Sequence, residues 1–254
     1  MLVGVIHCPP LPGSPRARPL EETLVSVERD ARTLVLAGFD LTMIENYGDA
    51  PFFAERVPAV TIAAMTACAL AAKRAGGKLG VNVLRNDAEA ALSVAACVGA
   101  SCIRVNVHTG ARVTDQGLVQ GRAAETVRLR DSLHKSEVAI WADVDVKHSA
   151  PLGVRPMEDE VSDAVERGLC DAVLVTGYGT GQSVDLDTLM RVKRISKVPV
   201  YAASGVTHDT VREILSACDG VIVGSALRAD GKAGGPIDPK RAAEFVARAR
   251  TSAK

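Results

Sequence analysis

A chain of 254 residues with 30 basic and 30 acidic side chains has no net charge, and only 3% of its residues are aromatic. These values argue against a nucleic-acid-binding protein, which usually carries a basic face. With 47% hydrophobic and 24% charged residues, the composition is that of an ordinary globular protein. The length suits one large domain over residues 1–254.

The cysteines and the apolar runs indicate a cytoplasmic protein. The six cysteines are scattered and form no CxxC pair, which is typical of reduced thiols rather than of a disulfide framework or a zinc site. The N-terminus has no basic segment followed by a long apolar run, so we expect no signal peptide. The longest apolar run, at residues 57–72, contains a proline and is shorter than the roughly 20 residues that span a bilayer. We therefore expect no integral membrane segment.

Apolar runs and helical patterns alternate along the whole chain, separated by turns rich in Gly and Pro. In chain order, the first half predicts strands at residues 2–7, 40–46, 79–84 and 101–108, each followed by a helix, at 20–37, 60–75, 88–98 and 123–134. The second half predicts strands from residue 138 and at 172–176, 198–203 and 220–223, followed by helices at 157–167, 186–194, 207–217 and 239–250. Asp87 and Thr207 are the predicted N-caps of two helices, and residues 109–121 and 151–156 are predicted loops.

Eight strand–helix pairs in 254 residues predict an α/β fold, a single closed (β/α)8 TIM barrel. An open doubly wound sheet is the alternative, but it gives no reason for the pattern to stop at eight strands. In a barrel, the C-terminal ends of all strands meet at one mouth, where the active sites of this fold lie.

The strand that begins at residue 138 carries charge where it ends. A period of two places Ile140 and Ala142 on one face and Asp143, Asp145 and Lys147 on the other. Buried carboxylates and ammonium groups are costly unless they pair, bind a ligand or do chemistry. An exposed edge strand with solvated charges is the alternative, but strands in a parallel sheet are covered on both faces.

The same pattern, applied strand by strand, places nine polar side chains at the predicted mouth: His7, Glu45, Asn82, Arg104, Asn106, His108, Asp143, Asp145 and Lys147. His7 alone could be a core histidine, and Arg104 could simply pair with Asp143. Nine polar side chains in one place indicate a functional site, in which neighbouring charges shift the pKa values of the titratable groups. Such shifts suit acid–base chemistry. We predict Glu45, Asp143, Asp145 and Lys147 as catalytic groups, and His7, Asn82, Arg104, Asn106 and His108 as substrate-binding groups.

Small residues end the last three predicted strands. They are Gly177, Ser204, Gly205, Gly224 and Ser225. Glycine lets an anion approach backbone N–H groups, and the loops after strands seven and eight are the usual phosphate site of a TIM barrel. Tight turns that need glycine for their geometry are the alternative. We predict these five residues as phosphate-binding.

Several long segments of the chain resemble the BtpA/SgcQ family. They are GVIH at 4–7 with LPGSP at 11–15, ENYGDAPF at 45–52, GVNVLRND at 80–87, RVNVHTGA at 104–111 and ADVDVKHSAP at 142–151. GYGTG at 177–181, SGVT at 204–207 and GVIVGS at 220–225 continue the match, which covers essentially the whole chain. The resemblance implies a barrel of the ribulose-phosphate-binding type. The family takes its name from a cyanobacterial protein of photosystem I biogenesis, but other members occur in organisms without a photosystem, so no reaction is implied.

Three hypotheses for function remain. The first is an isomerase, epimerase or lyase acting on a small phosphorylated sugar or related metabolite, in which Glu45, Asp143 or Asp145 moves protons and Lys147 stabilises an enolate-like charge or forms a Schiff base. The second is a divalent-metal enzyme with Asp143, Asp145 and either His148 or His7 as ligands. Period two puts His148 on the wrong face, so neither a metal nor another cofactor is predicted. The third is a non-catalytic assembly or stability factor. A homo-oligomer stays open by analogy with other barrels.

Overall fold

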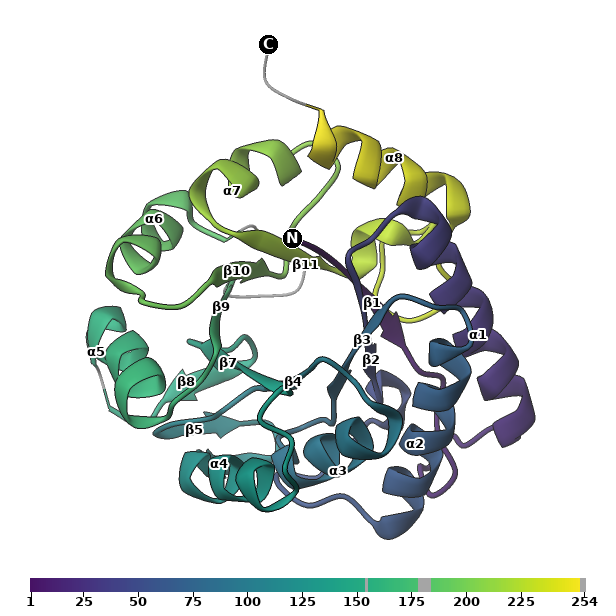
Figure 1. The fold of residues 1–254 in the computed structure, drawn as a ribbon, viewed down its shortest axis with the longest axis horizontal. Coiled ribbons are helices and arrows are strands. Elements are labelled where there is room, and N and C mark those ends of the chain that lie inside the picture. The colour runs from purple at the N-terminus through teal and green to yellow at the C-terminus, as the bar shows by residue number, and fades with distance from the viewer. Residues whose placement is uncertain (154, 178–183, 252–254) are drawn as a thin grey trace.

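The computed structural model describes residues 1–153, 155–177 and 184–251. Eight parallel strands of this described part close into a barrel, and helices surround it (Figure 1). Around the ring the strands are β1 (Leu2–His7), β11 (Gly220–Val223), β10 (Val200–Ala203), β9 (Ala172–Thr176), β7 (Ala139–Val144), β4 (Cys102–Val105), β3 (Lys78–Asn82) and β2 (Leu41–Glu45). Because β1 pairs with both β2 and β11, the ring is closed, which confirms the TIM barrel and excludes the open sheet.

The helices of the outer layer are α1 (Leu20–Ala37), α2 (Ala59–Lys73), α3 (Ala88–Val98), α4 (Ala123–Ser132), α5 (Met157–Ser162), α6 (Leu186–Ile195), α7 (Val211–Ala217) and α8 (Pro239–Arg250). Asp87 caps α3 as predicted, since its carboxylate accepts from the backbone N–H of Ala90. The predicted helix at 157–167 changes after α5 into a short π-helical segment, η2 (Asp163–Arg167). The prediction that Thr207 caps a helix is wrong, because α7 begins only at Val211 and the Thr207 hydroxyl accepts from Thr210 in the preceding turn.

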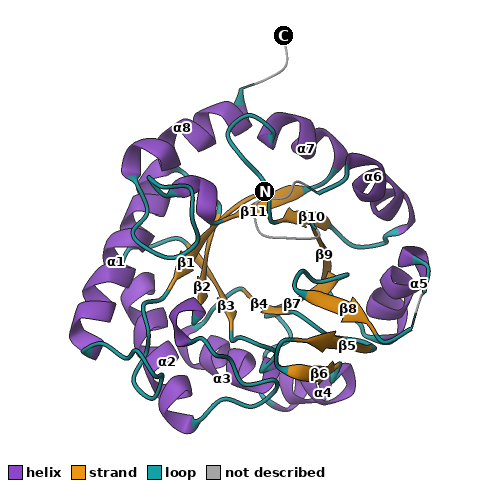
Figure 2. Ribbon diagram, turned by 180° about the vertical axis from the view of Figure 1, so that it is seen from behind, coloured by secondary structure: helices purple, strands orange, loops and turns teal. Residues whose placement is uncertain are grey.

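The predicted loop at 109–121 contains two short strands, and a third ends at the first residue of the predicted loop at 151–156. β5 (Ala111–Thr114), β6 (Gly117–Gln120) and β8 (Ser149–Pro151) form a small antiparallel sheet in the order β6-β5-β8. Figure 2 shows this sheet beside β7, outside the ring of barrel strands. Single turns of 3-10 helix, η1 (Tyr47–Asp49) and η3 (Ser225–Leu227), follow β2 and β11.

Alternate residues of each barrel strand face the interior. The lower part of this interior is filled by an apolar cluster that includes Val3, Val5, Leu41, Met43, Cys102, Trp141, Leu174 and Tyr201. The other face of each strand, for example Ile6 and Ile44, packs against the helices in a second and larger cluster. The interior is therefore closed below, and only its upper layer, at the C-terminal ends of the strands, is polar.

Candidate functional site

Four predicted mouth residues are neighbours in the strand register. His7 is paired with Glu45, Glu45 with Asn82, and Asn82 with Arg104, across β1, β2, β3 and β4. Each lies two residues after an interior residue of the same strand. Because side chains alternate between the two faces of a strand, all four point inward. The register thus brings residues from four strands into one continuous polar row.

Arg104 is the centre of a buried ion-pair network. Its Nε and Nη2 donate to the two carboxylate oxygens of Asp143, both at 3.0 Å, and its Nη1 donates to Glu45 Oε1 at 3.2 Å. Burial alone would lower the pKa of Arg104, but the two carboxylates outweigh it and raise the pKa. Asn106 completes the network by donating to Asp143 at 2.6 Å, while its own Oδ1 has no partner in the described structure. Asp143 is thereby fully enclosed.

Glu45 is held as a carboxylate. Burial would raise the pKa of this group, but Arg104, His7 and the hydrogen bond from Asn82 together lower it. Asn82 donates to Glu45 Oε1 at 3.0 Å, which leaves Oε2 facing His7 Nε2 at 3.8 Å. Glu45 therefore keeps one carboxylate oxygen outside the Arg104 network.

His7 is a neutral imidazole of defined tautomer. Burial and, after it, the charge of Arg228 lower its pKa from 6.5 to about 3. Nδ1 accepts a hydrogen bond from the backbone N–H of Gly234 at 2.9 Å, so the proton is on Nε2, which faces Glu45. The ring also stacks on Tyr47, with 4.4 Å between the ring centroids.

Lys147 reaches the mouth by a different route from the one predicted. β7 ends at Val144, and Asp145 then takes a positive φ of 51°, so the period of two does not extend to Lys147. The lysine nevertheless lines the same cavity as Glu45 and Arg104. Burial, followed by the charge of Arg104, lowers the pKa of its ammonium group. A lysine with a lowered pKa in a polar cavity is suited to proton transfer or to attack on a carbonyl group.

One cavity of about 140 Å³ joins the two predicted halves of the mouth. The polar half contributes His7, Glu45, Asn82, Arg104, Asn106 and Lys147, and the other half contributes Ser204, Gly205, Gly224 and Ser225. The halves are in contact at Gly224, where a Cβ atom would lie only 3.2 Å from the His7 ring. The hydroxyls of Ser204 and Ser225 form no hydrogen bond with the described residues, so they are free to bind a ligand.

The remaining predicted phosphate residue, Gly177, is buried directly after β9 but does not line this cavity. The next residues of its motif, at 178–181, lie outside the described residues.

Two of the predicted inward orientations are wrong. Asp145 does not line the mouth cavity, because the positive φ turns its side chain toward Arg112 of β5, with which it forms an ion pair. His108 lies beyond the end of β4, and its Nε2 contacts the backbone carbonyl of Gly168 at 2.8 Å, away from the mouth. In both cases the strand ends before the residue, so the strand period no longer decides its direction.

The proposed set of metal ligands is not assembled. Asp143 is enclosed by Arg104 and Asn106, and Asp145 is turned away. Within residues 1–153, 155–177 and 184–251, no three His, Cys, Asp or Glu side chains are grouped so that they could hold a metal ion.

Two arginines at the mouth were not predicted. Arg228 is 1% exposed, and its guanidinium donates to the backbone carbonyls of Val5, Gly224 and Gly234, which fixes the loop after β11. Arg85 follows β3 and lines both the mouth cavity and a larger outer cavity of about 890 Å³. Both residues lie in loops, where no strand or helix period indicates a direction. The only signal for Arg85 was its place in the segment 80–87.

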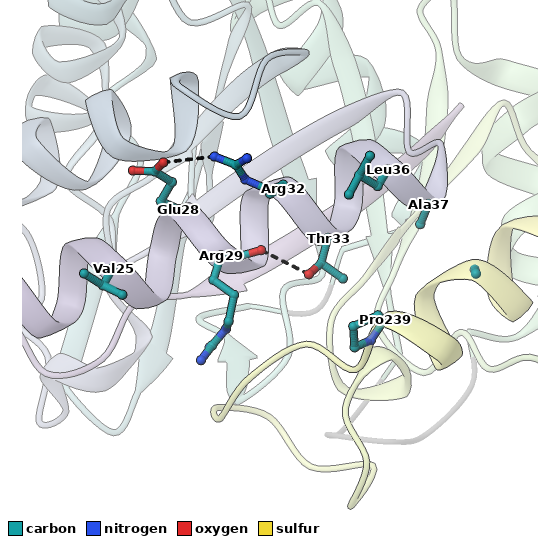
Figure 3. A pocket seen from close by; sticks show the side chains of 9 residues that line it. Val25, Glu28, Arg29, Arg32, Thr33, Leu36, Ala37 and Pro239 are labelled. Carbon is teal, nitrogen blue, oxygen red and sulfur yellow. Dashed lines mark hydrogen bonds and ion pairs between the residues drawn. The ribbon is translucent and has the colours of Figure 1, made fainter.

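A further hollow lies outside the barrel, between α1 and the start of α8 (Figure 3). Its charged residues are already paired: Arg32 donates to Glu28 at 3.2 Å, and Arg29 pairs with Asp30. This hollow therefore lacks the converging polar groups of the barrel mouth. In the part of the chain that the structure describes, no helix has the length and apolar character needed to cross a membrane.

The fold and the mouth define a (β/α)8 barrel with a polar cavity at the C-terminal ends of its strands, and solved structures share this fold. Thiamine phosphate pyrophosphorylase from Pyrococcus furiosus superposes with a TM-score of 0.59 at 15% identity, covering 98% of this chain and 96% of that one. N-(5'-phosphoribosyl)anthranilate isomerase from the same organism gives a TM-score of 0.58 at 18% identity and covers 98% of both chains.

The sequence profile of the BtpA family matches residues 1–251, and the chain belongs to this family. The photosystem I biogenesis protein BtpA of Synechocystis is 41% identical over 248 residues, which are 96% of this chain and 86% of that protein. An uncharacterized protein of Pyrococcus furiosus is 43% identical over 247 residues, which are 96% of this chain and 93% of that protein. The resemblance seen in the sequence segments is thereby confirmed.

Proposed function

We propose that this protein is an enzyme that moves protons within a small phosphorylated sugar or related metabolite, as an isomerase, epimerase or lyase. The observation that supports this most is the shared cavity, where Glu45, His7 and Lys147 face the Ser204–Gly205 and Gly224–Ser225 loops. The two structural neighbours named above have phosphate compounds in their names, and the loops after β10 and β11 occupy the usual phosphate position of the fold.

In the proposed reaction, the substrate phosphate binds the backbone N–H groups and hydroxyls of these two loops. Oε2 of Glu45 takes a proton from the hydroxyl-bearing carbon next to a carbonyl group, the C–H electron pair forms a C=C bond, and the π electrons of the carbonyl group move onto its oxygen. Lys147 stabilises that oxygen as an enediolate. Return of the proton to the former carbonyl carbon, with transfer of the hydroxyl proton between the two oxygens, gives an isomer. Delivery of a proton to the original carbon from the opposite face gives an epimer.

Other mouth residues would position these groups. Asp143 holds Arg104 in its bidentate geometry, and Arg104 with Asn82 fixes the Glu45 carboxylate. Lys147 could alternatively form a Schiff base with the carbonyl group, which suits a lyase. If Asp143→Asn and Lys147→Met both retained full turnover of an identified substrate, this assignment of roles would be wrong.

A thermal-shift screen tests the phosphate site. The purified protein is heated with inorganic phosphate, glycerol 3-phosphate, ribose 5-phosphate and ribulose 5-phosphate. A compound at 100 times its dissociation constant stabilises the folded state by about 2.7 kcal/mol, which is readily measured. A compound that shifts the melting temperature is then incubated with enzyme in D₂O, and NMR detects exchange of a carbon-bound proton.

Gly205 offers a matched pair of variants for the screen. Its φ of 67° is one that asparagine and aspartate tolerate better than other side chains. Gly205→Asp adds a negative charge to the phosphate loop and should abolish the shift, whereas Gly205→Asn adds the same shape without the charge and should retain more of it. Equal shifts in both variants and the wild type would place the phosphate elsewhere.

The second candidate is a non-catalytic assembly or stability factor, which the name of the Synechocystis relative, a photosystem I biogenesis protein, favours. The two functions separate in a complementation experiment with Glu45→Gln in a host that depends on this protein. Full in-cell function of a folded Glu45→Gln variant would favour the assembly factor, and loss of function would favour the enzyme.

A further inference from the structure

Arg85 is a buried cation without a counterion. Only 7% of the residue is exposed. One of its Nη atoms donates to the backbone carbonyl of Lys147 at 2.8 Å, and its Nε has no hydrogen-bond partner in the described structure. No carboxylate of the described residues lies within ion-pair distance of it. Leaving a buried guanidinium unpaired is unfavourable, and such groups are expected to bind an anion or to take part in function.

Arg104 has carboxylate partners at the same mouth, and Arg85 lacks such partners. Arg104 is equally buried, but Asp143 and Glu45 neutralise it at 3.0–3.2 Å. The acidic groups that face Arg85 are these same two carboxylates and Asp115 of the β5–β6 turn, all farther away, and Asp115 accepts from Gln116. Lys147, next to Arg85, also forms no ion pair with a described residue. The side of the mouth formed by Arg85 and Lys147 therefore carries uncompensated positive charge.

Arg85 lies across the barrel from the phosphate loops. It follows β3, and β3 is four strands away from β10 in the ring of eight, which is the opposite side. The mouth cavity extends between them, since Arg85, Lys147, Ser204 and Gly205 all line it. A ligand whose phosphate lies at Ser204–Gly205 would therefore direct its other end toward Arg85.

We propose that Arg85 binds a second anionic group, at the end of the substrate remote from its phosphate, while Lys147 next to it remains with the carbonyl oxygen. The substrate class is then a phosphorylated sugar acid or a sugar bisphosphate, rather than a simple sugar monophosphate. A guanidinium is suited to this role, because it binds either carboxylate or phosphate through two parallel hydrogen bonds. The inference rests on the proposed function, since it assumes the phosphate site after β10 and β11.

Titration calorimetry with two matched pairs of probes tests the proposal. 3-Phosphoglycerate and glycerol 3-phosphate differ by a carboxylate, and fructose 1,6-bisphosphate and fructose 6-phosphate differ by a phosphate. In at least one pair we expect the wild type to bind the probe with two anionic groups about tenfold or more tightly than its partner. The pair that shows the preference identifies the second group as carboxylate or phosphate.

Variants of Arg85 test whether this residue causes the tighter binding of the probe with two anionic groups. Arg85→Gln should bind the two members of a pair with nearly equal affinity, and Arg85→Lys should keep part of the difference. Arg56→Gln is the control, because Arg56 is exposed, pairs with Glu89 and lines neither the mouth cavity nor the outer cavity, and it should keep the full preference. The melting temperature of ligand-free Arg85→Gln should equal or exceed that of the wild type, since a buried unpaired charge is removed. A large drop would instead indicate a purely structural role and would contradict the proposal.

Binding of the probes by the wild type distinguishes failure of this inference from failure of the proposed function. Equal binding of both members in both pairs would overturn the second anion site and leave the phosphate site intact. Absence of binding by every probe, including inorganic phosphate, would overturn the proposed function and this inference with it.

Discussion

His7 illustrates how burial decides the protonation state of a single residue. The pKa of its imidazole falls to about 3 in the folded protein, because the ring is buried and Arg228 lies nearby. A neutral imidazole with its proton on Nε2 can donate toward Glu45 or toward a substrate oxygen without adding charge to the cavity. Its role at neutral pH is therefore that of a hydrogen-bond donor.

The lowered pKa of His7 predicts how stability depends on pH. Between pH 6.5 and about 3 the unfolded chain binds a proton at this position and the folded protein does not, so the free energy of unfolding decreases as the pH falls. The slope from this one group is up to about 1.4 kcal/mol per pH unit. In His7→Asn, which keeps an acceptor for Gly234, we expect a smaller loss of stability between pH 7 and pH 5. Urea unfolding at both pH values measures it, and equal losses in the two proteins would contradict the prediction.

Glu45→Gln should separate proton transfer from structure. The amide oxygen can still accept from Asn82 and Arg104, so the variant should fold, but it cannot take a proton from carbon. We expect kcat for an identified substrate to fall by about 10²–10⁴, with a much smaller change in the affinity for inorganic phosphate. Steady-state kinetics and calorimetry on the same preparation test this. Unchanged turnover would remove Glu45 from the reaction.

At the scale of elements, the small β6-β5-β8 sheet is anchored by one side chain. Arg112 of β5 is 6% exposed and donates to Ser149 of β8 at 2.8 Å, to Glu160 of α5 at 3.1 Å and to Asp145. It thereby ties the loops after β4 and β7 to the outer layer. Asp145, predicted from the sequence as a catalytic group, instead has a geometry that suits holding this sheet.

Arg112→Met should destabilise the protein, because it leaves Asp145 and Glu160 without their partner. Both carboxylates are partly exposed, so we expect a loss of about 1–3 kcal/mol rather than the larger cost of a fully buried pair. Arg122→Met is the comparison, since Arg122 pairs with Glu55 near the surface and should cost less than about 1 kcal/mol. Urea unfolding followed by circular dichroism gives both values. Equal losses would mean that Arg112 does not anchor the sheet.

The strand period predicted orientation well within strands and was unreliable beyond them, where Asn106, one residue past β4, still points into the mouth but other residues do not. His7, Glu45, Asn82, Arg104 and Asp143 all lie inside or at the last residue of a strand, and all point inward. Asp145 and His108 lie past strand ends, where turns with positive φ or contacts with other loops set the direction. Loop residues such as Arg85 are positioned by tertiary contacts, which leave no periodic signal in the sequence.

For the whole molecule, the alternation of apolar strands and helices was sufficient to predict the closed barrel, because eight units leave no strand edge unpaired. The polar upper layer followed from the same alternation, once the strands were placed in a ring. The pairing of Arg104 with Asp143 was one interpretation of the sequence and is present in the structure, but the pairs of Arg104 with Glu45 and of Arg112 with Asp145 were not predicted, since only the folded chain defines these distances.

Positively charged side chains gather around the outer cavity above the mouth. The net charge is zero, yet the described residues that line the outer cavity above the mouth include four arginines, Arg16, Arg18, Arg29 and Arg85, and one acidic residue, Asp115. Of these arginines, Arg29 is paired with Asp30. Arg16 and Arg18 are exposed and form no ion pair with a described residue. A local excess of positive charge attracts anions over roughly one Debye length, about 10 Å at 0.1 M salt.

This pattern predicts that binding of inorganic phosphate depends on salt although the protein is neutral overall. We expect its affinity to fall about two- to tenfold between 30 and 300 mM NaCl, because screening weakens the attraction of the arginine-lined entrance. The double variant Arg16→Gln/Arg18→Gln should bind more weakly at 30 mM and lose part of this salt dependence. Arg194→Gln/Arg212→Gln removes the same charge from exposed positions on α6 and α7 and should behave like the wild type. Identical salt dependence in both double variants would mean that the entrance arginines do not attract the anion.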